Sequence, residues 1–367
     1  MRGQWLGEYS GNTTGRIMIN IDEVRDHFEG VPYLHPNESG IPGTVAYFAT
    51  EDKKSEQTVT AFTAPIDPRT GFQTSWDKIQ DLYPEDVTHS EKATTLISQV
   101  GNSLTVVGET DIGVTFSGEL KRPDQRAGSK ITGKSMSWSE FKGHVSEISE
   151  AGYLFRGQQK PWRLCTSFHR RERYRISEFT SKDVKQLHQR LSAITSHFFD
   201  LTIPEQNGAF FNLLQHHGYP TPLLDWSYSP YVAAFFAFRD RPINYSGNES
   251  VRIYLFDNRE WQSRYRQVEN LDPAFPHLSV SDFIAIDNPR LVPQQAATTA
   301  TNLYDIEDYL LDKEEESGIK FLQAIDIPAR ERSAVMADLR FMGITAGSMF
   351  PSVDGVCEEL RERNFDR

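Results

Sequence analysis

The sequence predicts an α+β protein in which a small antiparallel β-barrel or sandwich precedes a mixed α/β domain. Between Gly3 and Leu120, alternating or β-branched runs are separated by Gly, Asn, Asp and Pro turns, which is typical of an all-β domain. Beyond Trp138, apolar residues recur at helical spacing between short strand-like runs. A polar stretch containing Pro123 and Gly128 separates the two patterns. The chain is therefore divided into a β-rich domain (1–120), a linker (121–136) and a second domain (137–367).

Five runs in the first domain are predicted to be strands, and the opening Gly3–Tyr9 segment resembles the first strand of small antiparallel barrels. None of these runs offers a catalytic set of side chains, so we interpret this domain as a sensing or recruiting module. The predicted strands are 15–22, 43–50, 57–66, 103–110 and 114–120.

Helices are expected in several parts of the second domain. Ser137 begins the first, which extends to about Glu150. The second spans 182–200, because Val184, Leu187, Leu191, Ile194 and Phe198 fall on one helical face. The third is an amphipathic helix over 330–342, and the charged run 312–316 is expected to form a surface turn.

Composition restricts the function classes. The 367 residues carry a net charge of −12, which argues against a broad nucleic-acid surface. No apolar run is long enough to cross a bilayer, and Cys165 and Cys357 provide no disulfide framework, so a cytoplasmic location is expected.

One basic stretch, His169–Arg175, is either a solvated face or a guide for a phosphate-rich substrate. The His216–His217 pair lacks companions at metal-ligand spacing, so no metal is expected.

Arg156 is the first candidate site residue. The apolar run Gly152–Phe155 is expected to be a strand that carries Arg156 to its edge, where Gly157 permits a turn or the close approach of a ligand. A guanidinium at such a position can bind a phosphate through two hydrogen bonds. The alternative is an ion pair with Asp225 that ties two strands together.

A second dense segment runs from Gln215 to Phe238. It predicts a strand over Thr221–Trp226 and then a helix that Pro230 opens, with Ser229 as its N-cap. The helix is apolar on nearly all sides and is therefore expected to be buried. Its first amides would then point toward Asp225, for which an ion pair or a capping role remains an alternative to a role in a site.

These segments resemble the FRG domain, a bacterial and phage-associated family called after its Phe-Arg-Gly tripeptide. Four ordered elements carry the resemblance, from about Trp138 to the C-terminus. They are Phe155-Arg156-Gly157-Gln158 with Trp162, the block beginning at Gln215, the element Asn288, Arg290, Gln294 and Gln295, and the closing Phe350, Pro351, Asp354 and Gly355.

The chain departs from the family pattern at two places. Ala296, Ala297 and Thr298 stand where relatives usually have Gly and then Phe after the paired glutamines. Pro222 stands where Arg is common before Leu223, which removes a candidate anion contact.

The order of the FRG motifs is similar to that of the ADP-ribosyltransferase fold, which holds NAD between two small sheets. That resemblance implies cleavage of the nicotinamide–ribose bond through a transition state of oxocarbenium character. Arg156 would anchor the pyrophosphate or ribose, and Trp226 or Tyr228 would form a wall for the nicotinamide. Gln295 or Gln294 would hold a ribose hydroxyl, but glutamine cannot act as a base. Asp225 is then the first candidate for a carboxylate, and Glu307 or Asp308 are weaker ones.

Gln158, His216 and Ser229 complete the set of side chains expected to contact NAD, with His216 as a stacking or hydrogen-bonding wall. Two functions remain open. The first is an ADP-ribosyltransferase-like toxin or antiphage effector that uses NAD to modify nucleic acid or protein. The second is a non-catalytic module that senses a nucleotide or nucleic acid. A nuclease is a less favoured alternative, because no Asp/Glu set has two-metal spacing.

Overall fold

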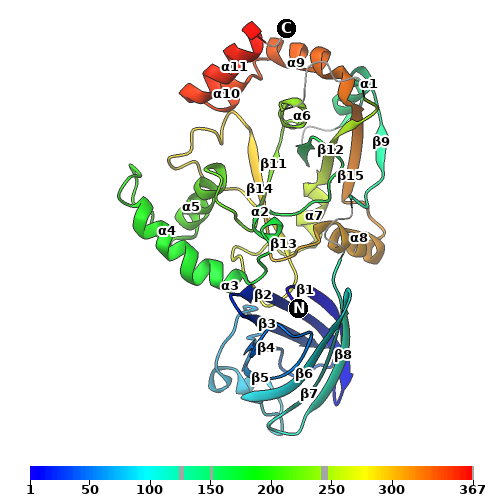
Figure 1. The fold of residues 1–367 in the computed structure, drawn as a ribbon, viewed down its shortest axis with the longest axis vertical. Helices are drawn as coiled ribbons and strands as arrows, with labels where there is room; N and C mark the ends of the chain where they lie inside the picture. The colour runs from blue at the N-terminus through cyan, green and yellow to red at the C-terminus, as the bar shows by residue number, and fades with distance from the viewer. Residues whose placement is uncertain (124–127, 149–151, 241–246, 366–367) are drawn as a thin grey trace.

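The computed structural model describes residues 1–123, 128–148, 152–240 and 247–365. Its first part is a closed barrel of eight antiparallel strands, each paired with the next and the last with the first. Figure 1 shows this barrel below the remainder of the chain. Of the two expected architectures, a small antiparallel barrel or a sandwich, the barrel is confirmed. Its strands are β1 (Gly3–Gly11), β2 (Gly15–Val24), β3 (His27–Pro36), β4 (Thr44–Ala49), β5 (Glu56–Pro65), β6 (Lys92–Val100), β7 (Ser103–Thr110) and β8 (Thr115–Lys121).

Two barrel strands, β3 and β6, are missing from the sequence prediction. Strand β3 contains Gly30, Pro32 and Pro36, which normally indicate turns. Pro32 is accommodated because the β3–β4 ladder is interrupted between the Gly30–Phe48 and Tyr33–Val45 pairs. Closure of the barrel therefore overrides the local sequence signal.

The second part contains a seven-stranded sheet with the order β13-β14-β11-β10-β12-β15-β9. Only β9 and β15 are parallel. Strands β10 and β11 share a single residue pair, Phe155 with Ser227, so the two halves of the sheet diverge beyond it. The strands are β9 (Gly133–Ser135), β10 (Tyr153–Gln158), β11 (Leu223–Ser227), β12 (Ser250–Asp257), β13 (Leu278–Ser281), β14 (Ala296–Thr301) and β15 (Leu322–Pro328).

Helices cover both faces of this sheet (Figure 1). Helices α1, α6 and α9 share one apolar core with alternate residues of β10 and β12, and α7 and α8 share another on the opposite face. Helix α5 packs beside β11 and β14. The helices are α1 (Trp138–Glu147), α2 (Ser167–Arg170), α3 (Ile176–Glu178), α4 (Val184–Leu191), α5 (Pro204–His216), α6 (Pro230–Phe238), α7 (Asn258–Arg264), α8 (Ile306–Ser317), α9 (Arg332–Phe341), α10 (Ala346–Met349) and α11 (Val353–Phe365).

The predicted strand, turn and buried helix after Gln215 are confirmed as β11 and α6. Ser229 caps α6 by accepting a hydrogen bond from the Val232 amide, and Pro230 is its first residue. Of the two roles expected for Gly157, the turn is wrong because the residue lies within β10, and the close approach of a ligand stays a prediction. A Cβ on Gly157 would meet the Ala233 carbonyl oxygen at 1.8 Å, so the glycine allows α6 to lie directly on the strand.

The expected helix over 182–200 is wrong at its C-terminal end. A π-helical turn (Phe179–Asp183) leads into α4, which ends at Leu191, and Ile194 and Phe198 are exposed. The hydroxyls of Ser192 and Thr195 bind the carbonyls of His188 and Leu191 at this end. These local hydrogen bonds compete with continuation of the helix.

Three further sequence expectations can be compared with the structure. The charged run 312–316 belongs to α8 and is not a turn. Ser137 begins α1 with a capping box to Glu140, as expected, although the predicted end at Glu150 lies outside the described residues. Helix α9 falls within the predicted 330–342. Within the expected linker 121–136, residues 124–127 are not described and 133–135 form β9.

The barrel is joined to the second part by buried polar contacts. Asp22 accepts hydrogen bonds from the Tyr174 amide at 2.6 Å and the Arg175 amide at 3.3 Å. Gln4 donates to the Asn302 carbonyl at 2.7 Å and accepts from the Tyr304 amide at 2.8 Å. Because these groups are buried, breaking the contact would leave them without partners, so the two parts are held in a fixed relation.

Asp272 at this junction is expected to make stability depend on pH. It accepts a hydrogen bond from Tyr33 of the barrel at 3.4 Å, and burial raises its carboxyl pKa to about 6. Its contribution to the free energy of unfolding is therefore full below about pH 4 and falls as the pH rises through 6. The free energy of unfolding of Asp272→Asn, taken relative to that of the wild type, should therefore rise by up to about 3 kcal/mol between pH 4 and pH 7. Urea unfolding at pH 4 and pH 7 measures this difference, and Asp77→Asn, at an exposed position, is the control. The same difference between Asp272→Asn and the wild type at both pH values would contradict the prediction.

Candidate functional site

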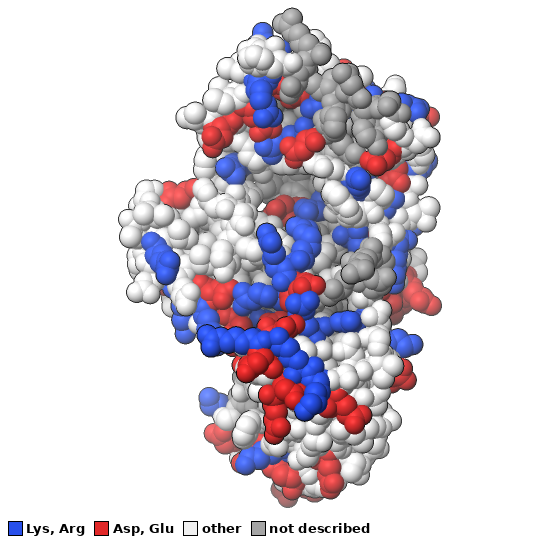
Figure 2. Space-filling view, in the orientation of Figure 1, with Lys and Arg blue, Asp and Glu red and all other residues white. Residues whose placement is uncertain are grey.

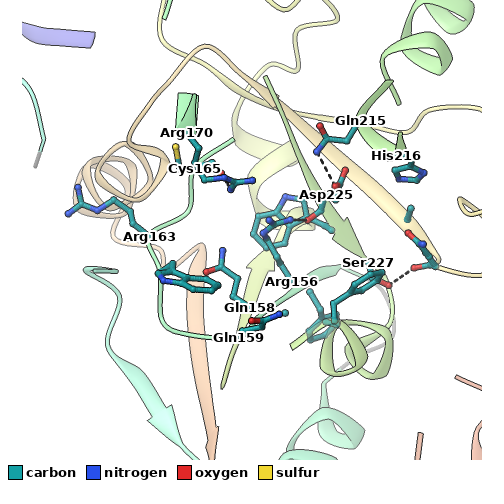
Figure 3. Close-up of a pocket in the computed structure, with 18 of the residues that line it drawn as sticks. Arg156, Gln158, Gln159, Arg163, Cys165, Arg170, Gln215, His216, Asp225 and Ser227 are labelled. Carbon is teal, nitrogen blue, oxygen red and sulfur yellow. Dashed lines mark hydrogen bonds between the residues drawn. The ribbon is translucent and has the colours of Figure 1, made fainter. Parts of the chain in front are cut away.

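A cavity of about 1030 Å³ opens where β10 and β11 diverge. Its walls come from both strands, from α6, from the C-terminal end of α5 and from the segments that follow β10 and precede β14. Figure 3 shows polar side chains from these separate parts of the chain converging on one space. A volume of this size accommodates a dinucleotide-sized ligand.

Arg156 lies in the middle of β10 and faces this cavity, rather than standing at a strand edge as expected. Its Nη1 donates to the main-chain carbonyl of Asp225 at 2.6 Å (Figure 3). That carbonyl belongs to the part of β11 that has separated from β10, so the side chain replaces a missing ladder bond. Burial lowers the pKa of Arg156 to about 10, the Asp225 charge opposes this shift, and Arg170 reinforces it. Arg156 therefore remains charged at neutral pH.

Three arginines share an arrangement that favours anion binding. Arg156, Arg170 and Arg290 all line the cavity. Each donates to a neutral main-chain carbonyl, Arg170 to Cys165 at 2.6 Å and Arg290 to His216 at 2.8 Å. Among the described residues, none of the three forms an ion pair with a carboxylate, although the charge of Asp225 acts on Arg156. A phosphate supplies the acceptors and the charge that such a group lacks.

Buried polar atoms without partners gather at the same place. In the described part of the chain, eight buried side-chain nitrogens or oxygens have no hydrogen-bond partner, and five belong to residues that line this cavity. Buried polar groups are nearly always hydrogen-bonded in native proteins, so their concentration here indicates a site for a polar ligand. The five atoms are Arg156 Nε, Gln158 Oε1, Arg163 Nε, His169 Nε2 and Asp225 Oδ1.

Asp225 places a carboxylate beside Arg156. Its Oδ2 accepts a hydrogen bond from Gln215 Nε2 at 3.0 Å, and its Oδ1 is one of the unpartnered atoms. The two alternatives for this residue are not seen among the described residues, because Arg156 binds its main chain and Ser229 itself caps α6. Asp225 lines the cavity and is oriented by Gln215, and its buried Oδ1 is left without a hydrogen-bond partner.

Of the other expected contacts, Gln158, His216, Trp226 and Gln294 line the cavity. Trp226 is buried and donates from Nε1 to Thr299 Oγ1 at 3.0 Å. His216 is 3.0 Å from Asn288 Oδ1 through its Nδ1. Gln294 donates from its amide to the Met349 carbonyl at 2.9 Å, which ties the third motif to α10.

Five expected site residues do not line the cavity: Ser229, Gln295, Tyr228, Glu307 and Asp308. Ser229 is buried at the start of α6 and does not line the cavity. Gln295 is exposed, with φ of +45°, and its carbonyl accepts a hydrogen bond from the Tyr228 amide at 2.9 Å. The left-handed backbone at Gln295 turns its side chain away from Gln294, so only the first of the paired glutamines reaches the cavity.

Several cavity residues were not assigned to the site from the sequence. The basic stretch His169–Arg175 offered a signal, and the structure divides it: Arg170 faces the cavity, whereas Arg173 and Arg175 pair with Asp183 and Glu29. Figure 2 shows Lys and Arg side chains gathered beside a hollow in the middle of one face, despite the acidic composition. Trp162 lies in the same wall with 51% of its surface exposed, as an available stacking surface.

Other chemistries find less support in the described residues. Burial raises the pKa of the Cys165 thiol to about 12, so it is a poor nucleophile. The described residues contain no group of three or more His, Cys, Asp or Glu side chains arranged to hold a metal ion. No helix in the described ranges has the length and apolar character needed to cross a membrane.

Fold and cavity together define a two-domain protein, a closed β-barrel joined to a mixed-sheet domain with a basic pocket. Residues 151–245, which include the first two of the four motifs, match the model of the FRG domain, so the chain contains an FRG domain. No curated protein is similar enough to this chain to count as a match. Among solved structures, a redesigned β-barrel, mFAP1, bound to DFHBI aligns with 33% of this chain and 94% of its own, with 12% identity and a TM-score of 0.23.

Proposed function

We propose that the FRG domain binds NAD in the arginine-lined cavity and cleaves its nicotinamide–ribose bond, passing ADP-ribose to a nucleic-acid or protein acceptor. One observation carries the proposal: Arg156, Arg170 and Arg290 line one cavity, and the guanidinium of each donates to a neutral main-chain carbonyl. The pyrophosphate of NAD supplies the two negative charges that this arrangement favours. The sheet divides into two halves where β10 and β11 diverge at the cavity, and this arrangement also suits a nucleotide held between two small sheets.

The cleavage step assigns a role to Asp225. As the bond breaks, its electron pair leaves with nicotinamide and positive charge develops on the ribose, as in glycoside hydrolysis. The free Asp225 Oδ1 would stabilise that charge electrostatically. An acceptor hydroxyl or water then adds to the ribose carbon and loses its proton. Trp226 or Trp162 would pack against a ring of the ligand.

The second candidate is a non-catalytic module that binds a nucleotide or nucleic acid. The position of Gln295 favours it, because the paired glutamines then contribute only Gln294, whose side-chain amide is already bound to Met349. In the first candidate the protein is a toxin or antiphage effector; in the second its pocket reports the presence of a ligand.

Two measurements on the purified chain separate these functions. Nicotinamide release from NAD is followed with and without DNA, RNA or cell lysate, and NAD binding is followed by calorimetry. We expect Asp225→Asn to lower release at least about 100-fold while NAD binding changes by less than about threefold, since Asp225 acts mainly on the transition state. Arg264→Ala, on the exposed surface of α7, is the matched control.

The outcomes are distinct. Binding without release by the wild type under every condition supports the sensing module. The absence of both binding and release would reject NAD as the ligand of this cavity.

A further inference from the structure

The barrel contains a second cavity, of about 500 Å³, which the proposed function does not use. Large side chains fill one end of the lumen, where Trp5, Leu104 and Leu120 are fully buried. Farther along, the inward positions of three neighbouring strands carry Ala46, Ala61 and Ala93, and these small side chains line the cavity. An eight-stranded barrel is just wide enough to be filled by side chains or to hold one small ligand, so alanines at these positions leave room for a ligand.

The chemistry of the lining restricts the ligand. Most of the lining side chains are aliphatic or aromatic, and Asp86, on the exposed segment before β6, is the only Asp, Glu, Lys or Arg among them. No described lining residue could therefore neutralise an anionic ligand, in contrast to the arginine-lined cavity of the FRG domain (the FRG cavity). The volume lies within the range of small-molecule sites.

A polar pair marks one side of the cavity. His89 Nε2 lies 3.1 Å from Thr44 Oγ1, and the His89 ring is stacked against Trp76 with 6.0 Å between centroids. Burial lowers the pKa of His89, so the imidazole is neutral at physiological pH and can donate or accept one hydrogen bond. A few placed polar groups in an apolar lining are typical of sites that orient a small molecule.

We propose that the barrel lumen binds a neutral, mostly apolar small molecule that places one polar group against the His89–Thr44 pair. This site is separate from the FRG cavity and does not depend on the function proposed for it. Strand β1 lies between the two, since Tyr9 lines the lumen while Gln4 binds the main chain of Tyr304, a residue of the FRG cavity.

The test uses N-phenyl-1-naphthylamine, a neutral apolar fluorophore with one N–H group, and the full chain. We expect a saturable rise in fluorescence with one probe per chain. Ala93→Phe fills the lumen and should weaken binding at least about tenfold, whereas Thr94→Phe, on the exposed face of the same strand, should change it less than twofold. The absence of saturable binding, or equal affinity in the Ala93→Phe variant with its circular dichroism preserved, would overturn the proposal.

Two further arms keep the test decisive. If Ala93→Phe fails to fold, Ala61→Leu replaces it, because Ala61 is the cross-strand neighbour of Ala93 and leucine is smaller than phenylalanine. Unchanged probe affinity in Ala61→Leu would also overturn the proposal. The sulfonated relative 1-anilinonaphthalene-8-sulfonate has the same rings with a negative charge. We expect its binding to the lumen, measured as the part lost in Ala93→Phe, to be at least about tenfold weaker; equal binding would reject a neutral ligand.

Discussion

Replacing Arg156 with alanine is expected to weaken NAD binding on the order of 100-fold. The side chain holds the Asp225 carbonyl at 2.6 Å, and its unpartnered Nε lies in the cavity wall. A hydrogen bond to a charged group contributes about 1.5–3 kcal/mol, and each 1.4 kcal/mol corresponds to a factor of ten. Isothermal titration calorimetry with NAD measures the change directly.

Two further variants sharpen this expectation. Arg156→Lys keeps the charge but loses the planar fork that can bind the Asp225 carbonyl and a phosphate together, so an intermediate loss of about tenfold is expected. Arg264→Ala removes an arginine that pairs with Glu260 within α7, outside the cavity, and should leave affinity unchanged. Wild-type affinity in Arg156→Ala would show that the ligand does not depend on this cavity.

Replacing Gly157 with alanine is expected to destabilise the protein by about 3 kcal/mol or more. The added Cβ would lie 1.8 Å from the Ala233 carbonyl oxygen and 2.8 Å from the Ala237 nitrogen. Both are main-chain atoms of α6 and cannot rotate away, so the helix would have to move off β10. Urea unfolding followed by tryptophan fluorescence gives the free energy of unfolding.

The matched control for Gly157 is Gly143 of α1. A Cβ there would meet no atom within 4 Å, and the residue is exposed inside a helix. Alanine has the higher helix propensity, so Gly143→Ala should stabilise the protein by about 0.5–1 kcal/mol. If the two alanine variants had similar stability, the close packing of α6 on β10 would not matter as described.

The comparison of sequence and structure is informative at particular residues. Ser229 and Pro230 were identified as a helix start because an N-cap and a proline at the first helical position act locally. Arg156 and Asp225 were predicted to lie together, and they do, although through the main chain of Asp225 instead of its carboxylate. Spacing along the chain carries no information on which atom of a residue faces its neighbour.

Other residues show where local patterns are insufficient. Ile194 and Phe198 continue a helical apolar face in the sequence, yet they are exposed because the chain leaves the helix at Leu191. Gln294 and Gln295 are adjacent and chemically identical, and a single positive φ at Gln295 separates a buried cavity residue from an exposed one. The sequence marked Arg170 only as one member of the basic stretch His169–Arg175 and did not separate it from Arg173 and Arg175.

The sequence by itself determined a small antiparallel β-domain, either a barrel or a sandwich, followed by a mixed domain. It also determined the FRG motifs and the strand, cap and buried helix around Asp225. These depend on periodicity, turn residues and capping, which act over a few residues. Only the tertiary structure decided that β10 and β11 separate after one residue pair, that Arg156, Arg170 and Arg290 meet in the cavity there, and that the barrel lumen is left partly unfilled. Those features depend on contacts between segments that are distant in the chain, and local sequence patterns do not predict such contacts.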